Sequence, residues 1–112
     1  MVEKTIGLCG IGNGLVDIQV EVDDSILEKF NLNKGEMQLA DKSEQQELLI
    51  ALSSFKQYKS SGGSAANTII AFSQFGGKAA YMTSLGKDGL GSFYAKEFTD
   101  LGVKNPNSNY AI

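Results

Sequence analysis

Residues 62–91 decide the fold of this chain: GGSAANTIIAFSQFGGKAAYMTSLGKDGLG. The apolar residues recur at helical spacing from Ser64 onward, and Gly76 and Gly77 form a typical helix stop. The next segment, residues 79–86, is mostly apolar and predicts a strand. A helix followed directly by a strand is typical of an α/β fold.

The flanking segments extend this α/β pattern in both directions. Downstream, a turn at 87–91 leads into a predicted helix over 92–101, which Gly102 closes. Upstream, the apolar residues 5–11 predict a strand of a parallel sheet with both faces buried. Residues 16–22 alternate between apolar and polar, as a half-exposed strand does, and we interpret them as a flap.

The segment between the flap and the glycine pair predicts helices. Residues 24–30 predict a short amphipathic turn or helix. A longer helix is predicted from Ser43, whose spacing to Gln46 fits a capping box, to about Tyr58. The last ten residues contain a proline and three asparagines and predict a loop.

The composition excludes several classes of protein. The chain has 112 residues, 42% of them hydrophobic and 21% charged, which fits one small globular domain. Its net charge is -3 and no basic stripe is visible, so we expect no nucleic-acid partner. No apolar run approaches the roughly 18 residues that span a bilayer, and the N-terminus lacks a secretion signal. We therefore expect a cytoplasmic protein without a membrane partner.

The absence of histidine excludes several kinds of chemistry. It removes Ser-His-Asp hydrolases, Cys-His proteases and metal sites built on imidazole. The single cysteine, Cys9, can form neither an internal disulfide nor a cysteine-rich zinc site. We predict no metal site and assign no catalytic residue. Any chemistry must come from Asp, Glu, Lys, Asn, backbone amides or a partner segment.

Two glycine-rich patterns do not fit nucleotide-binding motifs. The motif GIGNG at 10–14 has Leu15 where a dinucleotide fingerprint needs glycine, and a strand pattern follows it instead of a helix. The Gly-Lys pairs at 77–78 and 86–87 lack the spacing of a P-loop. Another interpretation remains open for the first two glycines of GIGNG, in which they only end the strand and turn the chain.

The glycine pair before the central helix is the best candidate for a ligand site. Gly62 and Gly63 allow a ligand to approach the backbone, where free amides can donate hydrogen bonds. Asn67 lies in the first turn and can donate and accept. Alone, this pattern is equally explained by a turn and a cap. Asn13 and Asp17 lie near a strand end, where α/β folds bind ligands, so the set favours binding of sugar hydroxyls.

Together these motifs resemble the N-terminal signature of the ribokinase-like (PfkB) carbohydrate kinases. The matching positions are Gly62, Gly63, Asn67, Gly76 or Gly77, Gly86, Asp88 and Gly91. The opening GIGNGLVDI at 10–18 and LNKGEMQLAD at 32–41 resemble the adenosine-kinase branch of the family. The resemblance extends from about Ile6 to Val103.

The resemblance implies that residues 1–112 are the N-terminal, substrate-binding and lid portion of a three-layer αβα sheet fold with a β-strand lid. The ATP-binding portion would then be absent from this chain. The implied residues for a sugar or nucleoside are Asp17, Gly62, Gly63 and Asn67, supported by Asn13 and covered by Leu15, Met37 and Leu39 of the flap. In some family members the lid also forms a homodimer interface.

The resemblance also implies phosphoryl transfer from ATP to a sugar hydroxyl, with Mg²⁺, in the complete enzyme. The family's catalytic base is the Asp of a later G-A-G-D motif, and these 112 residues contain no such motif. Two alternatives remain open. The chain could be a non-catalytic module that binds a sugar or nucleoside, or a truncated interaction fragment whose flap pairs with another subunit.

Sequencing the DNA beyond the codon for Ile112 separates these hypotheses. An open reading frame that continues into a G-A-G-D segment would make this chain the N-terminal piece of an active kinase. A stop codon directly after Ile112 would contradict the kinase hypothesis for this chain and would leave binding or assembly as its work.

Overall fold

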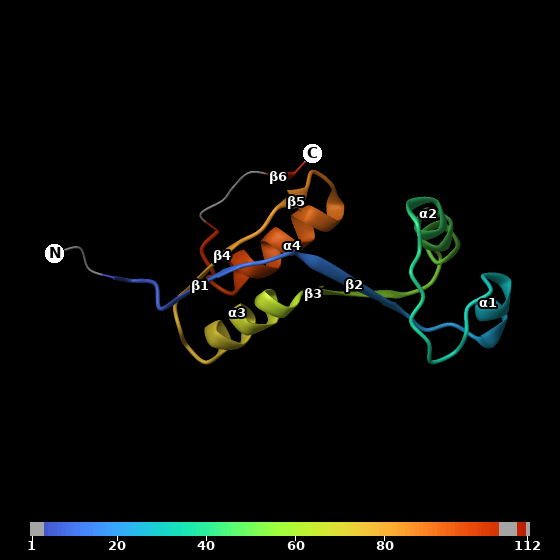
Figure 1. The fold of residues 1–112 in the computed structure, drawn as a ribbon, viewed down its shortest axis with the longest axis horizontal. Helices are drawn as coiled ribbons and strands as arrows, with labels where there is room; N and C mark the ends of the chain where they lie inside the picture. Colours follow the sequence, from blue (N-terminus) through green and yellow to red (C-terminus); the bar gives the residue numbers. More distant parts are fainter. Residues whose placement is uncertain (1–3, 106–109, 112) are drawn as a thin grey trace. The chain divides into compact units, whose positions relative to one another are not determined.

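The structure, a computed structural model, describes residues 4–105 and 110–111, and the chain divides into two compact units (Figure 1). The first unit comprises residues 1–17 and 60–112, and the second comprises residues 18–59. In chain order the elements are β1 (Leu8–Ile11), β2 (Leu15–Val20), α1 (Asp24–Lys29), α2 (Lys42–Ala51), β3 (Gln57–Gly62), α3 (Ser64–Gln74), β4 (Ala79–Met82), β5 (Leu85–Gly86), α4 (Gly89–Asp100) and β6 (Tyr110–Ala111).

Parallel strands form the centre of the first unit. β1 pairs with β4 in parallel, with Leu8 opposite Ala79. An isolated parallel bridge joins Ala80 to Lys104, and β5 pairs in parallel with β6. Parallel strands connected through helices confirm the predicted α/β class, because parallel pairing requires crossover connections. The strand predicted over 79–86 is divided into β4 and β5.

Helix α3 packs on β1 at two glycines, and Figure 1 shows this helix running beside the strand. A Cβ atom at Gly10 would lie 2.9 Å from Cγ1 of Ile69, and one at Gly12 would lie 2.8 Å from the Cβ of Ala65. Real Cβ atoms do not come this close to other carbons. These glycines therefore permit close packing between strand and helix, in addition to ending the strand.

The core of the first unit is built around aromatic side chains on β4 and α4. Tyr81 stacks on Phe98 with ring centroids 5.1 Å apart, and Tyr94 lies 4.9 Å from Phe98. The buried core residues are Ala66, Ile69, Ala79, Tyr81, Leu85, Tyr94, Phe98 and Val103. Only one face of β1 is covered within the described residues, and Ile11 on the other face is 74% exposed. The predicted burial of both faces is thus wrong for this part of the chain, because no described helix packs on the second face.

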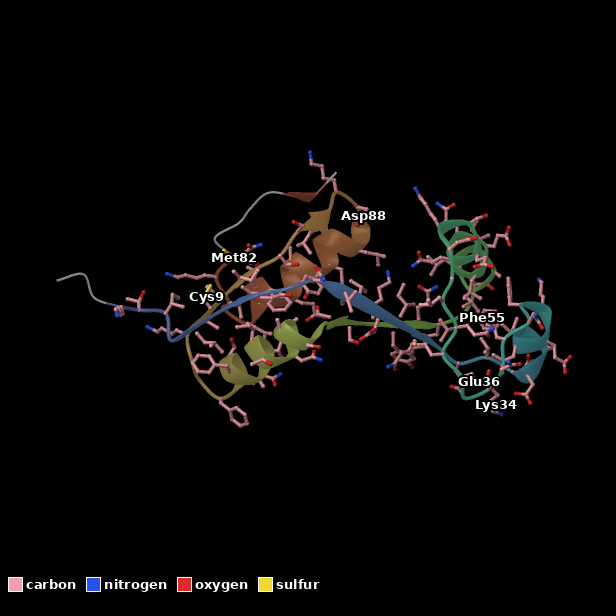
Figure 2. The ribbon with its side chains drawn as sticks, viewed as in Figure 1. Cys9, Lys34, Glu36, Phe55, Met82 and Asp88 are labelled. Atoms are coloured by element: carbon pink, nitrogen blue, oxygen red, sulfur yellow. The ribbon has the colours of Figure 1, made fainter. Side chains whose placement is uncertain are left out.

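Helix α4 begins at Gly89, three residues before the predicted start. Asp88, labelled in Figure 2, caps it by accepting a hydrogen bond from the Gly91 amide at 2.8 Å. A Cβ atom at Gly91 would lie 1.9 Å from the carbonyl oxygen of Gly86. The turn between β5 and α4 therefore leaves no room for a side chain at this position.

The second unit contains α1 and α2, and an aspartate caps each helix. Asp23 accepts from the Ser25 amide at the start of α1. At the start of α2, Asp41 accepts from the Glu44 amide while the Glu44 carboxylate accepts from the Asp41 amide, each at 2.8 Å. This capping box corrects the predicted one at Ser43. Asp and Ser are comparable N-cap residues, so the two overlapping patterns could not be separated by sequence.

Strand β3 was not predicted. Helix α2 ends at Ala51 rather than near Tyr58, and residues 57–62 form a two-stranded sheet with β2. The leucines and Phe55 follow a helical spacing, but the polar sequence QYKSSG gives little sign of a strand. Its extended conformation comes from pairing with β2, a tertiary effect that overrides local propensity.

The C-terminal segment also differs from the prediction of a loop. Residues 110–111 form β6, whereas residues 106–109 and 112 lie outside the described part of the chain. The glycine stop of α3, the half-exposed strand β2 and the short helix α1 are confirmed. Within residues 4–105 and 110–111, no helix is long and apolar enough to cross a membrane.

Replacing Gly91 with alanine should destabilise the intact protein. The new Cβ atom meets a backbone oxygen, so the turn must shift, and overpacking of this kind costs about 1–3 kcal/mol. Gly89→Ala is the matched control, because Gly89 begins the same helix with nothing near its Cβ position. That variant should gain up to about 1 kcal/mol from helix propensity. Denaturant unfolding measures both, and equal free energies of unfolding for the two variants would contradict the packing argument.

Candidate functional site

The N-terminus of α3 presents free backbone donors. Gly63 is its N-cap residue, with φ at 109°, and no side chain caps this end. The first hydrogen bond of the helix runs from the Asn67 amide to the Gly63 carbonyl at 2.8 Å. The three preceding amides, at residues 64–66, therefore have no carbonyl partner in an earlier turn of the helix. These amides, with the positive end of the helix dipole, favour an acceptor oxygen on a ligand.

Asp17 of β2 brings a carboxylate to the same glycine pair. The alternation of β2 exposes Asp17 while its two neighbours on the strand are half-buried. A Cβ atom at Gly62 would lie 2.7 Å from the Oδ2 atom of Asp17, so the carboxylate rests against the backbone of Gly62. Within the described residues, no hydrogen bond or ion pair engages this carboxylate. Its oxygens are thus available to accept from a ligand.

Asn13 approaches the glycine pair through its main chain. Its carbonyl oxygen would lie 2.6 Å from a Cβ atom at Gly63. The next residue, Gly14, donates its amide to the Oγ1 atom of Thr83 at 2.9 Å. This bond ties the loop after β1 to the residue that follows β4. The side chain of Asn13 is exposed on this loop, which the bond holds in place.

Tyr94 of α4 contacts the site from the core side. Its hydroxyl donates a buried hydrogen bond of 3.1 Å to the carbonyl oxygen of Gly62. Burial raises the pKa of the Tyr94 phenol above its ordinary value, and the neighbouring Tyr81 hydroxyl raises it further. Neither Tyr94 nor Thr83 belongs to a motif. The only signal for Tyr94 is a polar tip on a residue of the apolar stripe of its helix.

Six of the eight predicted site residues lie in the first unit. These are Asn13, Leu15, Asp17, Gly62, Gly63 and Asn67. The contacts that join them run mainly through backbone atoms, and the side chain of Asn67 is exposed in the first turn of α3.

The three predicted flap residues are all exposed. Leu15 lies on β2 and is 56% exposed. Met37 and Leu39 belong to the second unit, between α1 and α2, and are 90% and 93% exposed. The carbonyl oxygen of Leu15 would lie 3.7 Å from a Cβ atom at Gly62, so Leu15 approaches the glycine pair through its main chain. The assignment of all three side chains as a cover for the ligand stays a prediction.

This arrangement suits a ligand that carries hydroxyl groups. A hydroxyl donates one hydrogen bond and accepts others, so it can donate to the Asp17 carboxylate and accept from an amide of the α3 N-terminus. A ligand with only acceptor groups would leave the carboxylate without a donor. The combination therefore favours a polyol over a simple anion.

The described residues do not fit a resident metal. Within residues 4–105 and 110–111, no group of three or more Asp, Glu, Cys or His side chains could hold a metal ion.

Comparisons with known proteins define the family to which this chain belongs. The sequence model for the pfkB family of carbohydrate kinases matches residues 32–109, and the chain belongs to this family. Among curated proteins, adenosine kinase 2 of Arabidopsis thaliana is 33% identical over 99 residues, which cover 86% of this chain and 29% of that protein. The chain thus spans less than a third of the length of this relative.

Solved structures agree with this assignment. The adenosine kinase from Sinorhizobium meliloti is 34% identical with a TM-score of 0.70, covering 95% of this chain and 32% of that one. A probable sugar kinase from Rhizobium etli CFN 42 is 31% identical with a TM-score of 0.71, covering 97% and 32%. These neighbours confirm the expected fold, the N-terminal part of a ribokinase-like α/β kinase.

Replacing Gly63 with alanine should destabilise the intact protein more than the same change at Gly76. Both glycines have positive φ values, 109° and 93°, where a residue with a side chain costs about 1–3 kcal/mol. At Gly63 the new Cβ atom also meets the Asn13 carbonyl, whereas at Gly76 it meets nothing within 4 Å. Thermal and denaturant unfolding compare the two variants. A smaller loss of stability for Gly63→Ala than for Gly76→Ala would refute the close approach of the Asn13 carbonyl to Gly63.

Proposed function

We propose that this chain is the acceptor-binding portion of an ATP-dependent kinase that phosphorylates a hydroxyl group of a sugar or nucleoside. The observation that carries the proposal is the Asp17 carboxylate, which rests against Gly62 beside the uncapped N-terminus of α3. Membership of the pfkB family supplies the reaction class, because its members are carbohydrate kinases.

A nucleoside is the acceptor that we favour. Its ribose carries neighbouring hydroxyl groups that can engage a carboxylate and a backbone amide together. Relatives with 33% and 34% identity are named adenosine kinases, and the similar sugar kinase keeps a simple sugar as the alternative. A hydroxyl-binding set of this kind would serve either acceptor.

Each predicted residue has a defined role in this proposal. Asp17 accepts hydrogen bonds from the acceptor hydroxyls, and the amides after Gly63 donate to them. The Asn13 and Asn67 side chains, which are exposed near the glycine pair, add amide donors and acceptors. The apolar flap residues are Leu15, Met37 and Leu39, which would cover the bound acceptor and keep water away from it.

In the complete enzyme, the γ-phosphoryl group of ATP moves to an acceptor hydroxyl, which loses its proton. We place the catalytic base, the nucleotide and Mg²⁺ outside the residues of this chain. The residues here bind and orient the acceptor, and fixed orientation removes much of the entropic cost of bringing two substrates together. We further propose that the protein acts in the cytoplasm and that the flap can pair two subunits.

Replacing Asp17 with alanine in the intact protein should weaken acceptor binding far more than ATP binding. Hydrogen bonds to a charged group contribute about 1.5–3 kcal/mol each, so the KM for adenosine should rise at least roughly tenfold. The Asp17→Asn variant removes the charge but keeps the size of the side chain, so its comparison with Asp17→Ala separates the two contributions. Asp100→Asn is the control, because Asp100 is an exposed carboxylate on α4 whose ion pair, among the described residues, is with Lys96. Equal losses of affinity for adenosine and ATP would argue against the proposed role.

The intact wild-type protein also separates the alternatives. A coupled assay tests the kinase proposal directly by measuring ADP formation from ATP with adenosine, ribose or fructose as the acceptor. Acceptor binding in calorimetry without ADP formation would instead favour the non-catalytic module. A dimer that binds none of these acceptors would favour the interaction fragment.

A further inference from the structure

We propose that Tyr94 is a positioning residue for the acceptor site, because its hydroxyl holds the peptide between Gly62 and Gly63 in the orientation that the acceptor needs. This inference rests on the proposed function. It concerns a residue of the core that belongs to no glycine motif and is 1% exposed.

The hydrogen bond links distant parts of the chain. The Tyr94 hydroxyl on α4 reaches the carbonyl oxygen of Gly62 at 3.1 Å across 32 residues of sequence. Both residues are buried, so water does not compete for this carbonyl. The bond connects the aromatic core directly to the last residue of β3.

The geometry of the peptide group explains why this carbonyl matters. The Gly62 carbonyl and the Gly63 amide belong to one planar trans unit and point in opposite directions. Holding the carbonyl toward Tyr94 therefore turns the Gly63 N–H away from the core. In the opposite orientation of this peptide, the Gly62 carbonyl oxygen would point away from the core in place of the Gly63 N–H.

A peptide flanked by two glycines is the kind most free to rotate. Neither residue has a Cβ atom that restricts φ and ψ, and Gly63 already adopts a φ of 109°. The same lack of side chains admits the Asp17 carboxylate and the Asn13 carbonyl at close range. The site thus needs glycines for access and a separate contact for rigidity, and Tyr94 supplies that contact.

Packing alone does not require a tyrosine at this position. The Tyr94 ring contacts Phe98 with centroids 4.9 Å apart, an interaction that phenylalanine would also make. A buried hydroxyl is costly unless it forms a hydrogen bond, so the bond to Gly62 accounts for the polar tip. The Tyr81 hydroxyl lies in the same cluster, is buried, and has no hydrogen-bond partner among the described residues. It provides a matched control.

The test is Tyr94→Phe in the intact protein, with adenosine and ATP as substrates. We expect the KM for adenosine to rise roughly three- to tenfold, the effect of one neutral hydrogen bond, while the KM for ATP stays unchanged. Tyr81→Phe should leave both values unchanged. Replacing Tyr94 with 4-aminophenylalanine keeps an N–H donor at the ring tip and should restore the KM for adenosine.

A second control separates positioning from general stability. Phe98→Leu loosens the same aromatic cluster without removing the hydroxyl, so it should lower the melting temperature but leave the KM for adenosine near the wild-type value. An equal rise of that KM in Phe98→Leu and Tyr94→Phe would overturn the positioning role. A Tyr94→Phe protein that does not fold would also overturn it, because the hydroxyl would then serve the fold itself.

The outcomes for the proposed function are distinct. A wild-type protein that neither binds adenosine, ribose or fructose nor forms ADP with them would refute the proposed function and this inference together. A wild-type protein that phosphorylates one of them, with an unchanged acceptor KM in Tyr94→Phe, would refute only the inference.

Discussion

The close contact between β1 and α3 is the constraint on which the site depends. It exists because Gly10 and Gly12 have no side chains, which lets Ile69 and Ala65 pack against the strand backbone. This contact places the N-terminus of α3 beside the loop that follows β1. The Asn13 carbonyl then lies against Gly63, and the helix amides open next to the end of the strand. Larger residues at the two strand positions would move the helix and its donors together.

The site itself is made mainly of main-chain atoms. Gly62 and Gly63 contribute open space, the amides of residues 64–66 contribute donors, and Asp17 adds a charged group beside them. For the proposed acceptor, specificity would then depend on how the backbone is held rather than on many polar side chains. Thr83 holds the loop after β1, and Tyr94 holds the end of β3. In this proposal, residues behind the site matter as much as those that face a ligand.

Local patterns were sufficient for part of this structure. The apolar spacing and terminal glycines of α3 and the alternation of β2 are signals contained within one element, and both were predicted. Strand β3 was missed because its polar residues become extended only through pairing with β2. The same limit applies to the site. The glycine pair and Asp17 were predicted from position, whereas the bonds of Thr83 and Tyr94 span 69 and 32 residues and leave no local pattern.

The course of the chain through β2 and β3 has a consequence for how this protein can vary. Residues 18–59 leave the first unit along β2 and return along β3, and these two strands are hydrogen-bonded neighbours. The ends of the inserted segment are therefore already close, so a change in its length costs little loop-closure entropy. Insertions and deletions can accumulate there without altering the register of β1 and β4. Residues 18–59 and the core around β1 and α3 can therefore evolve at different rates, so one scaffold can carry inserted segments of different length.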